Sequence, residues 1–252
     1  MSDPAPPASS SSLLSQKPIP PAERLIVALD VDGPSEAEAL VERLGDSVQF
    51  YKLGLQLFMA GGYFELVDRL KKLGKRIFVD LKFFDVPETV GSAVRQLARR
   101  DVDFATVHGN DSIMEAAVKQ RGKIDILGVT VLTSLDRGDI QALGFQCDVE
   151  ELVLSRARRA LAIGCSGVIS SGLEAPRLRA ELGPRLLVVA PGIRPVDNRA
   201  TDDQKRTVDV ATAFKNGADY IVVGRPIRGA ADPAEAARGV QKTIAELFPA
   251  PS

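Results

Sequence analysis

The stretch IFVDLKFFD (residues 77–85) joins an apolar run to three charged residues, Asp80, Lys82 and Asp85. Residues 77–79 are typical of a buried β-strand. Because strand side chains alternate between two faces, Asp80 and Lys82 should lie on the same side of this strand. Desolvating an unpaired charge is strongly unfavourable. We therefore expect opposite charges to be paired where this strand ends.

Similar apolar runs recur along the chain and alternate with segments of helical periodicity. The predicted strands are 24–31, 48–54, 76–82, 104–109, 125–132, 166–172, 185–192 and 219–226. Eight strand–helix units, with strands apolar on both faces, predict the α/β class and a (β/α)8 TIM barrel. A doubly wound open sheet is the main alternative. It is weakened because the first strand–helix turn lacks the dinucleotide-binding glycine pattern.

The unusual polar residues concentrate where the predicted strands end. In a TIM barrel, the carboxyl ends of the strands carry the active site, whereas the opposite face contributes stability. The residues at or just beyond these ends are Asp30, Lys52, Asp80, Lys82, His108, Thr133 and Arg225. So many polar strand ends are hard to explain as solvated surface. The pattern therefore predicts a functional site at this face.

Length and composition predict one barrel domain that follows an unstructured tail. The chain has 252 residues and a net charge of −1, so no global basic field favours nucleic acid or anionic lipid. Residues 1–20 are rich in Pro and Ser and predict a disordered tail, which leaves 21–250 for the barrel. No apolar run is long enough for a membrane span. Two isolated cysteines indicate a reducing compartment, and we expect a cytoplasmic protein.

Two adjacent loops favour a phosphate site. The segments 188–195 and 221–227 follow the seventh and eighth predicted strands, where TIM barrels often bind phosphate. Gly192 and Gly224 permit close backbone approach, while Arg194 and Arg225 offer planar forks suited to phosphate oxygens. The long polar loop 194–206 is typical of a lid, from which Gln204 could hydrogen-bond to ligand.

The charged residues at the second and third strands predict a different chemistry. Lys52, Asp80, Lys82 and Asp85 alternate in sign, so they can hold one another in place while water is excluded. Such a network offers Lys82 as a proton donor. The single histidine, His108, excludes multi-histidine metal sites. We interpret His108 as a hydrogen-bonded barrel residue rather than as a general acid.

These residues also carry a family resemblance. The segments VALD, YKLG, DLKFFDVPET, TVLTS, APGIRP and GRPI occur in this order at the predicted strand ends. Through them the chain from Arg24 to Leu247 resembles bacterial orotidine 5′-phosphate decarboxylase. The DxKxxD element alone is shared across the ribulose-phosphate-binding barrel superfamily. The resemblance implies decarboxylation of orotidine 5′-phosphate to UMP and CO2, the last step of de novo pyrimidine nucleotide synthesis. It implies no cofactor and no metal.

The resemblance also implies residue roles. Lys82 would protonate C6 of the pyrimidine through a carbanion intermediate, and Asp80 would lie beside the departing carboxylate. Lys52 and Asp85 would complete the array, with Asp85 contributed across the interface of an obligate homodimer. The substrate-binding residues implied are Asp30, Lys52 and Thr89 at the ribose hydroxyls, Asp80 beside the departing carboxylate, Thr133 and Ser134 at the pyrimidine edge, and Arg194, Gln204, Gly224 and Arg225 at the phosphate.

The chain departs from the family pattern at a few positions. Phe84 replaces a histidine common in bacterial relatives, residues 109–111 replace a small-residue segment, and the segment before Gln204 is longer than in some relatives. One alternative is a metal-dependent sugar-phosphate decarboxylase or synthase of the same superfamily, although Lys52 stands where a metal site would favour an acid. Another is a non-catalytic nucleotide-binding barrel that keeps only the phosphate site.

Overall fold

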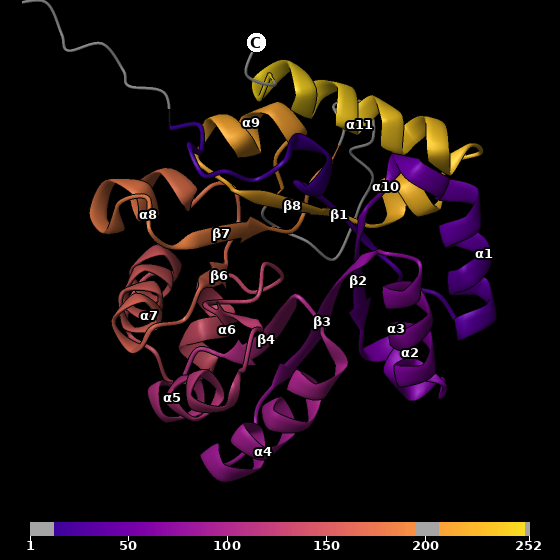
Figure 1. Cartoon of the computed structure of the whole chain (residues 1–252). Helices are drawn as coiled ribbons and strands as arrows, with labels where there is room; N and C mark the ends of the chain where they lie inside the picture. The colour runs from indigo at the N-terminus through magenta and orange to yellow at the C-terminus, as the bar shows by residue number, and fades with distance from the viewer. Residues whose placement is uncertain (1–12, 195–206, 250–252) are drawn as a thin grey trace, which may run out of the picture.

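The chain forms a closed barrel of eight parallel strands that follow one another in chain order (Figure 1). The computed structural model describes residues 13–194 and 207–249. The strands are β1 (Leu25–Ala28), β2 (Phe50–Gly54), β3 (Arg76–Phe83), β4 (Phe104–His108), β5 (Asp125–Val129), β6 (Gly167–Ile169), β7 (Leu187–Ala190) and β8 (Tyr220–Val223). Because β1 pairs with both β2 and β8, the TIM-barrel prediction is confirmed and the open-sheet alternative is wrong.

Helices surround the barrel and cover the outer faces of its strands (Figure 1). The α-helices are α1 (Pro34–Leu44), α2 (Leu55–Met59), α3 (Tyr63–Lys72), α4 (Pro87–Leu97), α5 (Asp111–Gln120), α6 (Arg137–Ala142), α7 (Val149–Ile163), α8 (Ala175–Leu182), α9 (Val210–Lys215), α10 (Arg225–Arg228) and α11 (Pro233–Leu247). Single 3-10 turns are η1 (Pro21–Glu23), η2 (Gly45–Ser47) and η3 (Ala98–Arg100). None of the helices within the described ranges has the length and apolar character that crossing a membrane requires.

Two apolar clusters account for the burial of both strand faces. The larger cluster lies between the strands and the surrounding helices. The smaller fills the barrel with side chains from alternate positions, including Phe50, Phe104 and Tyr220. The rings of Phe50 and Phe104 are 5.0 Å apart, and Tyr220 meets both edge-on. The barrel interior is therefore a packed core, and an open cavity can form only at a strand end.

The third strand departs from regular geometry where its charged residues begin. β3 advances from Val79 to Phe83 while its neighbour β4 advances only from Ala105 to Val107. Within this irregularity Lys82 has a φ of 47°, in the left-handed region that side chains rarely adopt. Asp80 and Lys82 do come together, as the alternation predicts, but through a bulge rather than a regular strand.

The described part of the predicted tail packs against the barrel. Lys17 Nζ lies 2.9 Å from a carboxylate oxygen of Asp219, and the Ser15 hydroxyl donates to the same carboxylate. Asp219 is fully buried and also pairs with Arg179 at 2.6 Å. Residues 1–12 lie outside the described residues. Ser15 and Lys17, which precede the predicted boundary at residue 20, thus contact the barrel, because the buried Asp219 carboxylate needs polar and cationic partners.

Candidate active site

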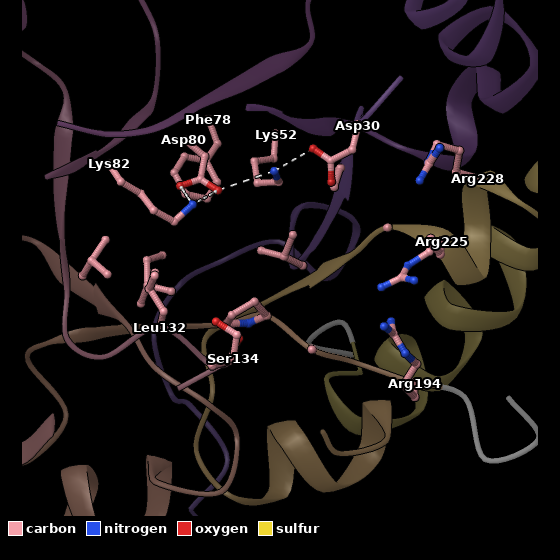
Figure 2. A pocket seen from close by; sticks show the side chains of 18 of the residues that line it. Asp30, Lys52, Phe78, Asp80, Lys82, Leu132, Ser134, Arg194, Arg225 and Arg228 are labelled. Carbon is pink, nitrogen blue, oxygen red and sulfur yellow. Dashed lines mark hydrogen bonds and ion pairs between the residues drawn. The ribbon is translucent and has the colours of Figure 1, made fainter. Parts of the chain in front are cut away.

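A cavity of about 340 Å³ opens at the carboxyl ends of the strands. Its wall is contributed by most of the strands and by the loops that follow them (Figure 2). The lining residues are Ala28, Asp30, Lys52, Phe78, Asp80, Lys82, Val129, Val131, Leu132, Thr133, Ser134, Ile169, Pro191, Gly192, Arg194, Val222, Gly224, Arg225 and Arg228. The predicted location of the site at this end of the barrel agrees with this cavity.

Four charged side chains form a continuous ion network along one wall of the cavity (Figure 2). Lys82 Nζ lies 2.9 and 3.0 Å from the two carboxylate oxygens of Asp80. Lys52 Nζ lies 3.4 Å from Asp80 Oδ2 and 3.0 Å from Asp30 Oδ1. The signs thus alternate in the order Asp30, Lys52, Asp80, Lys82. We call these four residues the charged array.

Burial and ion pairing shift the pKa values of Lys52 and Asp80, the two central residues of the charged array, in opposite directions. Burial alone would raise the pKa of Asp80, but the ammonium groups of Lys52 and Lys82 outweigh it and hold this pKa below its usual value. Burial alone would lower the pKa of Lys52, but the carboxylates of Asp80 and Asp30 raise it. Both residues are therefore charged at neutral pH, and the array presents preformed charge inside a protein cavity.

Thr106 supports the array from β4, and the sequence reasoning missed it. Its side chain is fully buried, and its hydroxyl donates to Asp80 Oδ1 at 2.9 Å. The hydroxyl oxygen of Thr106 also accepts the backbone N–H of Lys82 at 3.0 Å. One hydroxyl thus orients the acid and holds the left-handed backbone of the lysine. The missed signal is a polar residue inside the apolar run 104–108, where a hydroxyl needs a partner.

Gly54 ends β2 directly beneath the Lys52–Asp30 pair. A Cβ at this position would lie 3.1 Å from Lys52 Nζ and 3.3 Å from Asp30 Oδ1. Such contacts are tighter than a side-chain carbon normally tolerates, so a larger residue would push the two charged groups. Glycine at this position of the YKLG segment therefore leaves the space that the Lys52–Asp30 ion pair occupies.

Arginines line the end of the cavity opposite Lys82 (Figure 2). Arg194 follows β7, and Arg225 begins α10 directly after β8 and Gly224. Gly192 has a φ of 78°, which turns the backbone of the β7 loop in a way that suits glycine. Arg228, at the end of α10, lines the same end but was not predicted. The cavity thus has an arginine-lined end as well as the charged array.

Thr133 and Ser134 lie between these two ends. Both line the cavity from the loop after β5, and Thr133 is buried. Figure 2 shows Ser134 facing the space between the array and the arginines. Hydroxyl groups here can donate to or accept from the polar edge of a bound ring. The structure therefore brings these two predicted residues into the site.

Two predicted residues lie away from this cavity in a single copy of the chain, and a third falls outside the described residues. Asp85 and Thr89 are exposed, and neither belongs to the lining of the cavity within the described residues. The Asp85 carboxylate accepts the N–H of Val86 at 2.6 Å. Gln204 and the rest of the predicted lid, 195–206, lie outside the described residues.

The departures from the family pattern have a local physical explanation. His108 Nδ1 lies 2.8 Å from Asn110 Oδ1, and the Phe84 ring stacks on the imidazole at 4.3 Å between centroids. A Cβ on Gly109 would lie 2.4 Å from the carbonyl oxygen of Val129, so only glycine fits there. Asp111 pairs with Arg159 at 2.7 Å. As predicted, His108 is a hydrogen-bonded barrel residue; it does not line the cavity.

The arrangement of acidic, histidine and cysteine side chains among the described residues determines whether they could hold a metal ion. No group of three or more His, Cys, Asp or Glu side chains within 13–194 and 207–249 is arranged to hold a metal ion. The two acids that line the cavity, Asp30 and Asp80, are instead bonded to ammonium groups.

The chain is similar to known orotidine 5′-phosphate decarboxylases over most of its length. A family model described as orotidine 5′-phosphate decarboxylase / HUMPS family matches residues 23–240. The chain is 68% identical over 239 residues to an orotidine 5′-phosphate decarboxylase of Methylococcus capsulatus, covering 95% of this chain and 99% of the relative. It is 50% identical over 240 residues to that of Xanthomonas euvesicatoria, covering 94% and 98%.

Solved structures of orotidine 5′-phosphate decarboxylases also resemble this chain in fold. The crystal structure of orotidine 5′-phosphate decarboxylase from Lactobacillus acidophilus superposes with a TM-score of 0.79 at 33% identity, covering 88% of this chain and 99% of that one. The enzyme of the same name from Pyrococcus horikoshii superposes with a TM-score of 0.71 at 26% identity, covering 87% and 98%.

Proposed function

Because the chain belongs to the orotidine 5′-phosphate decarboxylase / HUMPS family, we propose that its charged array is the catalytic centre of a decarboxylase. The chain is a carboxy-lyase that converts orotidine 5′-phosphate to UMP and CO2, a step of pyrimidine nucleotide biosynthesis. The observation that carries the residue assignment is the unbroken network from Asp30 to Lys82, facing arginines across one cavity.

The chemistry requires stabilisation of a carbanion. Breaking the bond between C6 and the carboxylate leaves the electron pair in an sp2 orbital on C6, with no adjacent carbonyl to delocalise it. The protein has to lower the barrier by about 20 kcal/mol, near the upper end of ordinary enzymatic accelerations. A fixed ammonium beside C6 supplies the largest contribution. The Lys82 ammonium then donates its proton to C6 and completes the product.

Asp80 and its neighbours hold that ammonium in place. The bidentate contact between Lys82 and Asp80 fixes the direction of the amine, and Lys52 supports Asp80 from the other side. Asp80 would also lie beside the substrate carboxylate and disfavour the bound ground state, a secondary contribution. Asp30 and Lys52, at the end of the array nearest the arginines, would contact the ribose hydroxyls.

The arginine end would hold the phosphate. Arg194, Gln204, Gly224 and Arg225 are proposed phosphate contacts, while Thr133 and Ser134 read the pyrimidine edge. Binding energy from the remote phosphate can support an unfavourable arrangement of charges at C6. Replacing Arg225 with alanine should therefore lower kcat as well as raise KM.

We propose that the active enzyme is a homodimer. Asp85, in the loop after β3, and Thr89, in the first turn of α4, are exposed and do not line the cavity of their own chain. Large apolar side chains are also exposed on the segments that follow β2 and β3: Leu55, Phe58, Met59, Phe84 and Val86. A second copy of the chain would cover this apolar surface. It would also bring the partner's Asp85 to the Lys82 of the first copy and the partner's Thr89 to the ribose.

A cytoplasmic location is proposed as well. Cys147 and Cys165 are free thiols, as a reducing compartment favours. Burial raises the pKa of the Cys165 thiol to about 12, so this cysteine behaves as a small apolar core residue.

One assay separates this function from its alternatives. Purified protein is mixed with orotidine 5′-phosphate in excess chelator, and UMP and CO2 are followed. We expect turnover that added Mg²⁺ does not increase. Activity that disappears with chelator and returns with Mg²⁺ would favour the metal-dependent alternative. Binding of UMP without any turnover would favour the non-catalytic barrel.

A further inference from the structure

Arg228 is a cavity residue to which no role has yet been assigned. It ends the short helix α10, three positions after Arg225, and lines the cavity with Arg225 and Arg194. Figure 2 shows the side chains of all three arginines gathered at one end of the cavity. Because residues three apart on a helical turn lie on the same side, the spacing of Arg225 and Arg228 explains how both reach one site.

The bonding of Arg228 is incomplete. Its Nε is buried and has no hydrogen-bond partner among the residues that the structure describes. Arg24 shares this deficit at Nε, but its terminal nitrogens donate to the carbonyls of Asp219 and Lys17. Among the described residues, the terminal nitrogens of Arg228 form no hydrogen bond or ion pair either. A buried guanidinium N–H without an acceptor is unfavourable unless a ligand supplies one.

The charges around Arg228 indicate what that ligand is. Among the described residues, the acids that line the cavity are Asp30 and Asp80, and both are bonded to lysines of the array. The arginine end therefore brings three guanidinium groups to one part of the cavity wall. Like charges this close repel one another, and an anion with several oxygens relieves the repulsion. A phosphate monoester carries up to two negative charges and three acceptor oxygens.

We propose that Arg228 is a third arginine of the phosphate site and donates directly to the phosphate of the bound nucleotide. The proposal rests on the function above and deepens it, because it assigns to Arg228 a share of the discrimination between a nucleotide and the corresponding nucleoside. The guanidinium acts on the phosphate alone and not on the pyrimidine ring or C6. Its removal thus weakens binding only of ligands that carry the phosphate.

The test compares two ligands that differ in the phosphate alone. The dissociation constants of UMP and uridine are measured for the wild-type enzyme and for Arg228→Gln. We expect the constant for UMP to rise about 10- to 100-fold, the range for losing a hydrogen bond to a charged group, while that for uridine stays within about twofold. Arg228→Lys should fall between wild type and Arg228→Gln, since it keeps the charge but loses the planar fork.

Two controls separate this role from a structural one. Arg238→Gln removes an exposed arginine of α11 that pairs with Glu235 and should change neither constant. Thermal unfolding of each variant reports any general destabilisation. Equal weakening of UMP and uridine, or unchanged UMP binding, in Arg228→Gln would overturn the proposal while the decarboxylase assignment stands. If the wild-type enzyme itself fails to turn over orotidine 5′-phosphate, the proposed function fails instead.

Discussion

At the scale of single residues, the site depends on groups that hold other groups in place. Asp80 is bonded at once to Lys82, Lys52 and the hydroxyl of Thr106. Because these donors are fixed before substrate arrives, little reorganisation is needed when charge develops at C6. The left-handed backbone of Lys82 is an unfavourable local conformation that the surrounding contacts maintain.

Replacing Lys82 with alanine tests the proton donor. We expect turnover to fall by more than about 10⁴-fold, because both the stabilising ammonium and the proton are lost. UMP should still bind, since the arginine end is unchanged. The measurement is UMP formation together with the dissociation constant of UMP. Lys72→Ala, an exposed lysine of α3, serves as the control. A Lys82→Ala enzyme with near-normal turnover would show that another group donates the proton.

Replacing Thr106 with valine tests the support beneath the array. Valine keeps the volume but leaves the Lys82 N–H without its acceptor and Asp80 without one donor. We expect kcat to fall about 10- to 100-fold and the free energy of unfolding to fall by about 1–3 kcal/mol. Thr106→Ser restores the hydroxyl and should recover most of kcat. Equal kcat values for the valine and serine variants would exclude a positioning role for the hydroxyl.

The lowered pKa of Asp80 predicts a pH-dependent contribution to stability. Its ordinary value is 3.8 and its folded value is lower, so the stabilisation is fully present above the unfolded pKa and disappears as pH falls through the folded pKa. The free energy of unfolding of wild type minus that of Asp80→Asn should therefore be largest above about pH 5 and shrink in stronger acid. Denaturant unfolding across this range measures it. A difference that grows on acidification contradicts the ion network.

At the scale of elements, short additions to the barrel shape the site. α2, α6 and α10 follow the carboxyl ends of β2, β5 and β8, where the barrel carries the cavity. The bulge in β3 directs Lys82, and α10 carries both Arg225 and Arg228. The opposite end of the barrel has a different role, since the segment with Ser15 and Lys17 is held there by buried Asp219 near β8.

Truncation tests the role of this N-terminal segment. Deleting residues 1–17 removes the contacts of Lys17 and Ser15 with a carboxylate that is fully buried in the intact protein, so we expect the melting temperature to fall by several degrees. Deleting residues 1–12 keeps both contacts and is the matched control. Both truncated enzymes should keep their kcat at low temperature, because the cavity lies at the other end. Equal melting temperatures for the two truncations would show that these contacts contribute little.

At the scale of the whole molecule, barrel closure brings distant parts of the chain to one cavity. The array comes from the segments ending β1, β2 and β3, whereas the arginines come from those following β7 and β8. Only a closed ring places β8 beside β1 and so joins the two sets across one opening. In the proposed homodimer, one further copy of the chain would complete the arrangement at the exposed surface around Asp85.

Mixing two inactive variants tests that arrangement. Lys82→Ala and Asp85→Ala should each be inactive, but a mixed dimer would contain one site with both native residues. After random subunit exchange, we expect activity to return to about a quarter of the wild-type value. The measurement is UMP formation before and after co-refolding. If Asp85 acts within its own subunit, no activity returns.

The fold of this protein and part of its candidate site could be predicted from the sequence. Local apolar periodicity and the polar residues ending each run predicted the barrel, the location of the site and the pairing of Asp80 with Lys82, because these depend on neighbours in the chain. The β3 bulge, the support from Thr106 and the inward-facing Arg228 could not be predicted in this way. Each depends on which strands and turns become neighbours when the barrel closes, and a hydrogen bond between β3 and β4 leaves no periodic signal in either segment. Tertiary structure alone decided those contacts, because packing brings together groups that the chain keeps far apart.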